Sequence, residues 1–305
     1  MEKHKNFEKI VIFSRDELKQ HEMQLSGFDS DRLRYFIGDV RDVVRLRRAM
    51  YGIDIVVHAA ALKQVPACEY NPIEAVLTNI IGAKNVIDAA LDNGVKKVMA
   101  ISTDKAVNPI NLYGATKLVA EKLFIQANVY SGDREIRFSC VRYGNVLGSR
   151  GSVIPLFQQQ QKNSKVTVTD PQMTRFWITL EHGVNFVISC LEKMVGGEVF
   201  VPKIPSANIM DLVRVIAPES KVQIIGVRPG EKKQEVLISE NEAPQTIELS
   251  DMFIIKPNQP SWKAGRYPKG KKLLDGYIYS SRDNPQKLSV QDLRKLIKNL
   301  EDHEK

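Results

Sequence analysis

The sequence predicts an α/β fold built on a doubly wound parallel sheet. Short runs rich in Val, Ile, Leu and Phe alternate with segments of helical spacing through the first half of the 305-residue chain, an order typical of parallel sheets. The segment 54–61 (DIVVHAAA) is almost continuously apolar, as expected for a strand buried on both faces. Polar residues follow several of the expected strands, at the place where ligands bind in such sheets.

The first half of the chain divides into alternating strands and helices. Each expected strand is a short apolar run, and each expected helix carries apolar residues three and four positions apart. Gly94 follows the longest of these helices as a plausible C-cap. Strands are expected at 8–13, 33–37, 54–61, 97–102 and 137–143, and helices at 16–23, 43–50, 73–93 and 112–130.

After Gly151 the alternation is less regular, which predicts a smaller second domain of α+β type. Helices are expected at 153–162, 179–194, 209–216 and 288–300, and strands at 198–201 and 222–227. Ser289 would cap the last helix, with Asp292 three residues further on. The segment 240–288 has no clear pattern. We expect two interleaved domains, with residues 1–142 and 176–201 in the first and residues 143–175 and 202–305 in the second.

The composition excludes several classes of protein. Hydrophobic residues make up 43% of the chain and charged residues 26%, which is ordinary for a globular protein and unlike a disordered one. The 3 Cys are far apart and have no zinc-type spacing with His, so neither a disulfide framework nor a metal site is expected. No apolar stretch is long enough to span a bilayer, and the first residues lack a signal-peptide pattern. We therefore expect a cytoplasmic protein that binds no membrane.

The net charge leaves two classes of partner to weigh. The chain has 44 Lys and Arg against 36 Asp and Glu, a formal net charge of +8. A basic surface suits nucleic acid, but the basic residues are not interleaved with aromatic residues in a recognisable module. An enzyme with phosphate-rich ligands would have the same surface, and we expect no nucleic-acid partner.

The strongest local motif is the segment Tyr113-Gly-Ala-Thr-Lys117. On a helix, residues four apart lie on one face, so Lys117 would hold positive charge near the phenol of Tyr113 and lower its pKa from about 10. Ser102 and Thr103 end the preceding expected strand. This combination favours a tyrosine that takes a proton from a hydroxyl while hydride leaves the same carbon.

Further segments accompany this motif: HAAALK at 58–63, STDK at 102–105, RYGNVLGSRGSV at 142–153, MTRFWIT at 173–179 and RPGEK at 228–232. With them, the chain resembles the extended short-chain dehydrogenases/reductases, which have a Rossmann-like sheet. It is most similar to the inverting UDP-N-acetylglucosamine 4,6-dehydratases of bacterial surface-sugar biosynthesis. The dipeptide Asp104-Lys105 discriminates best, because retaining dehydratases usually carry Asp-Glu there and epimerases lack an acid/base pair at that place.

The resemblance implies a lyase mechanism. Tyr113, assisted by Lys117 and Thr103, would deprotonate the sugar 4-hydroxyl while hydride leaves C4 for NADP+. Lys105 would remove the C5 proton, which requires a neutral amine and therefore a pKa lowered by burial or nearby positive charge. Asp104 would be the acid that helps the C6 hydroxyl leave as water. Hydride would then return to C6, and a proton would return to C5 from the other face.

The resemblance also implies the ligand contacts. Arg15 follows a strand where an acidic residue would bind the ribose of NAD, which favours the 2′-phosphate of NADP, although NAD stays possible. Lys19 could share that role, and Asp39 and Val40 would contact the adenine. The expected cofactor-binding residues are Ser14, Arg15, Lys19, Asp39, Val40, Ala59, Ala60, Tyr113 and Lys117. The expected residues for UDP-N-acetylglucosamine are Lys63, Asn145, Arg150, Arg228 and Glu231. After Glu231 the chain departs from the family, because Lys232-Lys233-Gln234-Glu235 replaces the usual Lys-Leu-His-Glu, and the resemblance implies no contacts there.

One departure from the family concerns the start of the sheet. Family members begin with a strand and a Gly-rich loop, whereas the first glycine here is Gly27. The expected sheet lacks that strand and loop, so the strands at 8–13 and 54–61 would face a gap. Three hypotheses stay open: an active dehydratase completed upstream or by a separate N-terminal fragment, a truncated inactive remnant that retains nucleotide-sugar binding, and a nucleic-acid binder. The resemblance also suggests a homo-oligomer.

Overall fold

A mixed seven-stranded sheet forms the centre of the computed structural model, which describes residues 7–149, 151–258, 262 and 265–303. The strand order is β15-β13-β14-β9-β5-β4-β3. Strands β3, β4, β5 and β9 are parallel, as the sequence predicts. Strands β14, β13 and β15 continue the sheet in antiparallel fashion. The bounds are Ile55–His58 (β3), Lys97–Thr103 (β4), Arg137–Tyr143 (β5), Val199–Pro202 (β9), Thr246–Glu248 (β13), Met252–Ile255 (β14) and Lys271–Lys272 (β15).

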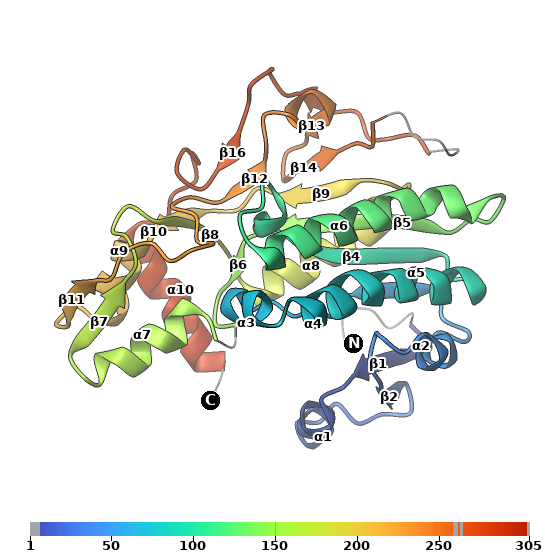
Figure 1. Cartoon of the computed structure of the whole chain (residues 1–305), viewed down its shortest axis with the longest axis horizontal. Helices are drawn as coiled ribbons and strands as arrows, with labels where there is room; N and C mark the ends of the chain where they lie inside the picture. Colours follow the sequence, from blue (N-terminus) through green and yellow to red (C-terminus); the bar gives the residue numbers. More distant parts are fainter. Residues whose placement is uncertain (1–6, 150, 259–261, 263–264, 304–305) are drawn as a thin grey trace.

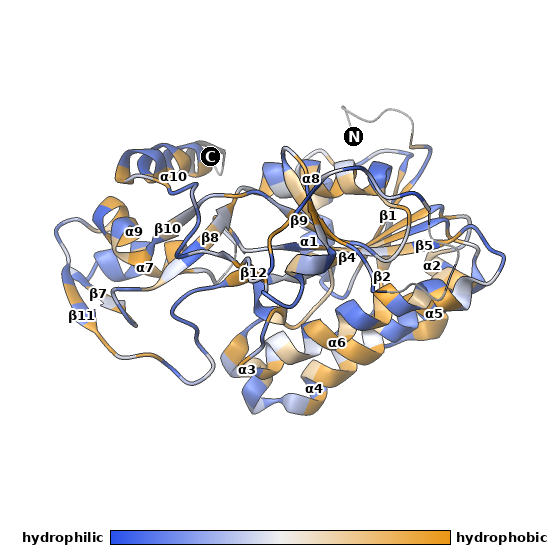
Figure 2. Ribbon diagram, turned by 90° about the horizontal axis from the view of Figure 1, so that it is seen from above, coloured by the Kyte–Doolittle hydropathy of each residue, from blue (hydrophilic) through white to orange (hydrophobic). Residues whose placement is uncertain are grey.

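Helices cover both faces of this sheet. Figure 2 shows α8 (Leu180–Lys193) on one face and α5 (Gly82–Asp92) and α6 (Leu112–Gln126) on the other. The helix expected to run to residue 130 ends at Gln126 and continues as the 3-10 turn η3 (Ala127–Ser131). The largest apolar cluster lies between α5, α6 and the central strands. Burial of this surface is the main favourable contribution to folding, and it fixes the strand ends that carry the site.

A second, two-stranded parallel sheet lies beside the main one. Strand β1 (Ile10–Ser14) pairs with β2 (Leu33–Ile37), and no described strand joins this pair to β3 (Figure 1). Helix α1 (Glu17–Leu25) begins after Asp16 and α2 (Val43–Ala49) after Asp42, and each Asp side chain accepts a backbone N–H two residues into the helix. Helix α2 packs against α5.

Two small sheets and three helices form a smaller α+β unit with its own apolar cluster. Strands β6, β8 and β10 make one sheet, and β7 and β11 make another. Its strands are Asn145–Val146 (β6), Lys165–Val168 (β7), Thr174–Ile178 (β8), Ser206–Asn208 (β10) and Lys221–Ile224 (β11), and its helices are Val153–Gln161 (α7), Ile209–Ile216 (α9) and Val290–His303 (α10). The Ser289 hydroxyl donates to Asp292 and accepts its N–H, as expected for the start of α10.

Three features differ from the sequence expectations. The helix expected at 73–93 is broken into α4 (Pro72–Val76), a π-helical segment η1 (Leu77–Ile81) and α5. A short helix α3 (Val65–Tyr70) precedes it. The segment without pattern, 240–288, contains η4 (Ala243–Gln245), β13, β14, β15 and β16 (Tyr279–Ser280). Strand β16 pairs in antiparallel fashion with β12 (Val236–Ile238), which precedes this segment. Strands β13 to β15 come from residues 202–305 but extend the sheet of the first predicted domain.

None of the helices in the described ranges combines the length and apolar character needed to cross a membrane.

A buried ionic cluster joins the sheet to the helices around it. Arg142 on β5 is 1% exposed and contacts Glu121 on α6 at 2.6 Å and Glu242, just before η4, at 2.9 Å. It also donates to the carbonyl of Leu237 at 2.9 Å. Glu121 accepts a hydrogen bond from the hydroxyl of Ser102 on β4. Two carboxylates and one guanidinium therefore fix α6 against β4 and β5.

We predict that Arg142→Met lowers the free energy of unfolding by about 3–5 kcal/mol, because it leaves Glu121 and Glu242 without their buried cation. Urea denaturation measures this change. The control is Arg214→Met, which removes an exposed ion pair with Asp211 and should cost less than about 1 kcal/mol. Equal losses for the two variants would contradict the assigned role.

Candidate active site

The carboxyl end of β4 brings the expected catalytic residues together. Asp104 and Lys105 form the 3-10 turn η2 (Asp104–Ala106) directly after Thr103. Asp104 is fully buried, and its Oδ1 accepts hydrogen bonds from Thr103 Oγ1 at 2.8 Å and Lys105 Nζ at 2.9 Å. The same amine donates to Asn145 Oδ1 at 3.2 Å. Asp104 Oδ2 is buried without a hydrogen-bond partner, which leaves it able to donate or accept a proton.

The charge state of Lys105 differs from the expectation. A neutral amine would need a lowered pKa, and burial does lower it, but the negative charges of Asp104 and Glu235 outweigh burial and raise the pKa of Lys105 above its usual value. The chain therefore holds an ammonium hydrogen-bonded to a carboxylate. The base that the sequence predicts forms only after a proton leaves this amine.

The expected effect of Lys117 on Tyr113 is also different. Tyr113 is 8% exposed, and burial raises its pKa to about 12, although the charge of Lys105 and a hydrogen bond with Thr103 act to lower it. Burial lowers the pKa of Lys117, whose amine donates to the carbonyl of Ile101 at 2.7 Å. Helical spacing places the two residues on one face, but the amine of Lys117 is directed to the strand.

Close backbone packing holds η2 against α6. A Cβ atom at Gly114 would overlap the carbonyl oxygen of Lys105, which explains the glycine next to Tyr113. Asn79, in the π-helical segment, donates to Thr116 Oγ1 at 2.9 Å and exchanges two hydrogen bonds with the backbone of Leu62. Such π-helical turns are frequent at functional sites. This one ties the HAAALK segment to the helix that carries Tyr113.

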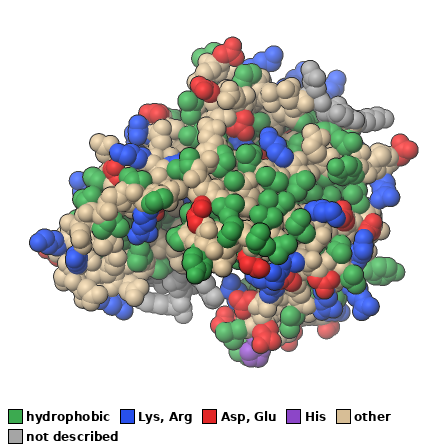
Figure 3. All heavy atoms as spheres, in the orientation of Figure 1, with side chains coloured by type: hydrophobic (Ala, Val, Ile, Leu, Met, Phe, Trp, Pro, Cys, Tyr) green, Lys and Arg blue, Asp and Glu red, His purple; other side chains and the backbone are tan. Residues whose placement is uncertain are grey.

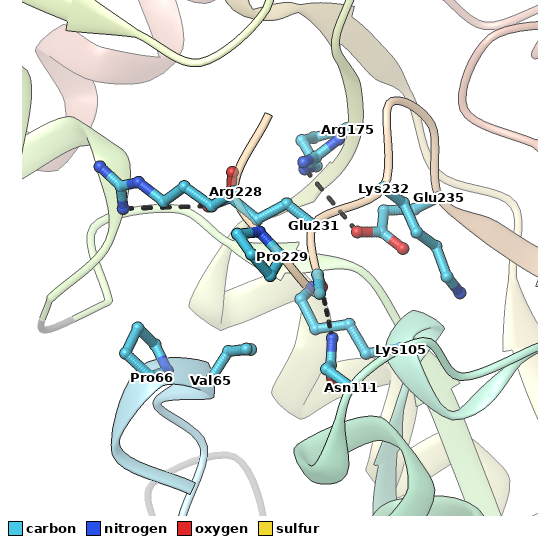
Figure 4. Close-up of a pocket in the computed structure, with 11 residues that line it drawn as sticks. Val65, Pro66, Lys105, Asn111, Arg175, Arg228, Pro229, Glu231, Lys232 and Glu235 are labelled. Atoms are coloured by element: carbon cyan, nitrogen blue, oxygen red, sulfur yellow. Dashed lines mark hydrogen bonds and ion pairs between the residues drawn. The ribbon is translucent and has the colours of Figure 1, made fainter. Parts of the chain in front are cut away.

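A cavity of about 190 Å³ opens beside Lys105. Figure 4 shows the loop of Arg228, Pro229 and Glu231 above it, and Val65 and Pro66 at the start of α3 below. The side chain of Asn111 caps α6 and donates to the carbonyl of Gly230 at 2.8 Å. The loop is therefore fixed to the helix of Tyr113. Additional charged residues of the lining are Arg175, Lys232 and Glu235.

The remaining predicted substrate residues are dispersed. Asn145 contacts Lys105, while Arg228 and Glu231 line the cavity with a 3.9 Å separation between their charged groups. Lys63 is exposed and does not line the cavity. Arg150 lies outside the described residues.

Most of the predicted coenzyme residues follow the carboxyl ends of β1, β2 and β3, whereas Lys19 lies on α1 and Tyr113 and Lys117 lie on α6. The guanidinium of Arg15 is 3.3 Å from the carboxylate of Asp39, which also pairs with Arg41 at 2.7 Å. Burial is the largest single effect on the pKa of Asp39 and raises it, but the hydrogen bonds and charges of the two arginines together outweigh burial and lower this pKa. The half-exposed Arg15 leaves donors for an anion. Val40, which was expected to contact the adenine, is buried in the main apolar cluster. Ser14 accepts the N–H of Asp16, Lys19 is 3.5 Å from Asp16, and Ala59 and Ala60 are exposed after β3.

Sequence reasoning missed several residues of the cavity. Arg175 lies within the MTRFWIT segment and Glu235 just after RPGEK, but spacing along the chain does not bring either to Lys105. Lys232 Nζ donates to the carbonyl of Val107 at 2.5 Å, and burial lowers its pKa. Sequence reasoning also missed Asn79, which does not line the cavity. The sequence held one indication of its role, because it is a polar amide within an otherwise apolar helix face.

The parallel sheet with helices on both faces is the arrangement of a Rossmann-like α/β protein, and Tyr113 and Lys117 lie beside the end of its strand β4. Residues 2–257 match the family described as polysaccharide biosynthesis protein. The chain belongs to this family.

Individual relatives cover almost the whole chain. The inverting UDP-N-acetylglucosamine 4,6-dehydratase of Campylobacter jejuni subsp. jejuni serotype O:23/36 (strain 81-176) is 51% identical over 96% of this chain and 90% of its own length. The UDP-glucose 4-epimerase of Rickettsia canadensis (strain McKiel) is 40% identical over 97% of this chain and 88% of its own. The X-ray structure of Pen from Bacillus thuringiensis is similar with a TM-score of 0.89 and 44% identity, over 96% of this chain and 90% of that one.

His58, at the end of β3, makes stability depend on pH. It is buried against Phe124, with ring centroids 5.5 Å apart, and burial and the charge of Lys117 lower its pKa from 6.5 to about 3. The unfolded chain takes up a proton below about pH 6.5, whereas the folded chain does not until about pH 3. The free energy of unfolding should therefore fall by about 1.4 kcal/mol per pH unit as the pH drops between these values.

We predict that His58→Gln removes this pH-dependent contribution to the free energy of unfolding, so that stability falls less between pH 7 and pH 5 than in the unmodified chain. Urea denaturation at both pH values measures the difference. His182→Gln, at an exposed position of α8, is the matched control and should leave the pH dependence unchanged. A parallel response of the two variants would contradict the buried neutral state of His58.

Proposed function

We propose that the chain is an inverting UDP-N-acetylglucosamine 4,6-dehydratase, a lyase. The observation that carries this proposal is the hydrogen bond of 2.9 Å between Lys105 Nζ and Asp104 Oδ1, next to Tyr113. The Campylobacter relative, at 51% identity, has that activity in its name.

The hydrogen bond supplies both catalytic groups in one proton transfer. If the proton moves from the ammonium of Lys105 to the carboxylate of Asp104, the pair becomes a neutral amine and a carboxylic acid. The amine then accepts the C5 proton of the 4-keto sugar, and the carboxylic acid protonates the C6 hydroxyl, which leaves as water. Both residues return to their starting charges. The raised pKa of Lys105 is thus compatible with its role as a base.

Tyr113 accepts the proton of the 4-hydroxyl in this proposal. Burial raises the pKa of Tyr113 to about 12, so the phenolate that accepts this proton is a minor form at neutral pH, and the charge of Lys105 and the hydrogen bond with Thr103 favour it. Lys117 lies one helical turn away, and its amine donates to the carbonyl of Ile101. A bound nicotinamide coenzyme would accept hydride from C4 and return it to C6. A proton from solvent that reaches C5 from the opposite face would complete the inversion.

We propose NADP as the coenzyme, with NAD as the alternative. The half-exposed guanidinium of Arg15 at the end of β1, beside Asp39, fits the 2′-phosphate of NADP, because Arg donates paired hydrogen bonds to phosphate. Lys19 on the next helical turn would add charge. Asn145, Arg228 and Glu231 would contact the UDP-sugar from the cavity wall.

We further propose that the enzyme works in the cytoplasm as a homo-oligomer. Figure 3 shows hydrophobic side chains gathered on the face that carries α4 and α6. Ile73 on α4 is 67% exposed and Val119 on α6 is 41% exposed, and exposed Ile81 in η1 and Ile110 just before α6 adjoin these helices in the sequence. A contiguous apolar surface of this kind is typical of protein interfaces, and a second copy of the chain would bury it.

We predict that the chain, supplied with NADP+, converts UDP-N-acetylglucosamine to a product lighter by one water. Asp104→Asn and Lys105→Met should each reduce this reaction at least about 100-fold, because each removes a general acid or base. Mass spectrometry of the product measures turnover. Asp54→Asn and Lys96→Met change an exposed ion pair of the same residue types and should leave turnover unchanged. A product of unchanged mass would instead indicate the 4-epimerase activity named for the Rickettsia relative.

We predict that Arg15→Ala weakens binding of NADP about tenfold, while binding of NAD changes little, because the lost charge-assisted hydrogen bonds are those to the 2′-phosphate. Isothermal titration calorimetry with each coenzyme measures the ratio. Arg47→Ala, which removes an exposed arginine paired with Asp92, is the control. Equal weakening of both coenzymes would contradict the assignment of Arg15.

A further inference from the structure

Glu235 is a buried carboxylate that the proposed chemistry does not use. It is 3% exposed and lines the cavity of Lys105 (Figure 4). Its backbone is fixed on both sides by Ser281, whose Oγ accepts the N–H of Glu235 at 3.0 Å and whose N–H donates to the carbonyl of Glu235 at 2.8 Å. The side chain is therefore held toward the cavity by the segment after β16.

The carboxylate of Glu235 is only partly compensated. Its Oε1 lies 3.8 Å from Nε of Arg175, a long ion-pair distance, and its Oε2 is buried with no hydrogen-bond partner. Leaving such an oxygen unpaired costs about 1–3 kcal/mol or more. Stability alone thus gives no reason for a glutamate at this position.

Four charged groups face Glu235 from three parts of the fold. Asp104 and Lys105 lie on η2, Arg175 lies on β8, and Lys232 lies on the loop that follows Arg228. Lys105 in turn faces Asp104, Glu235 and Arg175. Burial, followed by the charge of Asp104, raises the pKa of Glu235. The charge of Glu235 and that of Lys105 are therefore linked across the cavity.

We propose that Glu235 is a positioning residue that sets the pH at which Lys105 loses its proton, with Arg175 acting in the opposite direction. A carboxylate at this position stabilises the ammonium, and a guanidinium destabilises it. The balance between these two opposing charges decides how readily Lys105, the protonated partner of Asp104, gives up its proton. This inference rests on the proposed role of Lys105 as the base.

The test compares the reactivity of the Lys105 amine in the unmodified chain and in four variants. Competitive labelling with acetic anhydride across a range of pH, followed by mass spectrometry of the Lys105 peptide, reports the midpoint at which this amine loses its proton. The side chain of Lys105 is 25% exposed, so the reagent can reach it. Glu235→Gln should lower the midpoint by about one pH unit, which is about tenfold faster labelling below the midpoint. Glu235→Asp should restore most of the original value.

A variant of Arg175 is expected to shift the midpoint of Lys105 in the opposite direction. Arg175→Met removes the facing cation and should raise the midpoint, so slower labelling is expected at the same pH. This arm keeps the test decisive if Glu235→Gln lowers the folded fraction. Glu240→Gln, at an exposed position near the end of β12, is the matched control and should leave the midpoint of Lys105 unchanged.

The pH dependence of kcat/KM is the corresponding functional readout. The alkaline limb should move to lower pH in Glu235→Gln and to higher pH in Arg175→Met, whereas a merely structural role would lower kcat/KM at all pH values alike. Unchanged labelling midpoints in folded Glu235→Gln and Arg175→Met would overturn the inference. If the midpoints shift as expected but the unmodified chain removes no water, the charge coupling stands and the proposed function fails.

Discussion

The central constraint of this structure is the complete burial of the carboxylate of Asp104 at the end of β4. Burying an isolated charge costs several kcal/mol unless a counter-ion and hydrogen bonds compensate it. Lys105 and Thr103 supply both to Oδ1. The same compensation creates an acid and a base joined by one hydrogen bond. The stability requirement of η2 and the chemistry proposed for it therefore depend on the same contact.

The second buried ionic cluster serves this site by fixing α6. Glu121 accepts hydrogen bonds from Ser102 on β4 and from Arg142 on β5. Ser102 lies two residues before Asp104, so this contact sets the register of α6 along β4 close to the turn η2. Gly114 allows the helix to approach the backbone of Lys105. Tyr113 reaches the end of β4 because these contacts hold the helix close.

The sequence predicted the local features well and the long-range ones poorly. Periodicity and apolar runs located β2, β5 and α9 with their observed bounds, and the STDK and YGATK segments identified residues that lie together. Arg175 and Glu235 could not be predicted, because β8 and the loop before β12 approach Lys105 only in the folded chain. The expected directions of the pKa shifts of Lys105 and Tyr113 were wrong for the same reason, since burial and the charges that face these groups in the folded chain decide them.

The most direct test of the account follows the hydrogen atoms of the sugar. UDP-N-acetylglucosamine carrying deuterium at C4 is incubated with the chain and NADP+ in ordinary water, and the product is examined by NMR. The account predicts deuterium at C6, a solvent-derived proton at C5 and inverted configuration at C5. Deuterium retained at C4 of a 4-epimer, or retention of configuration at C5, would contradict the assignment of Asp104 and Lys105 as the acid and base of an inverting dehydratase.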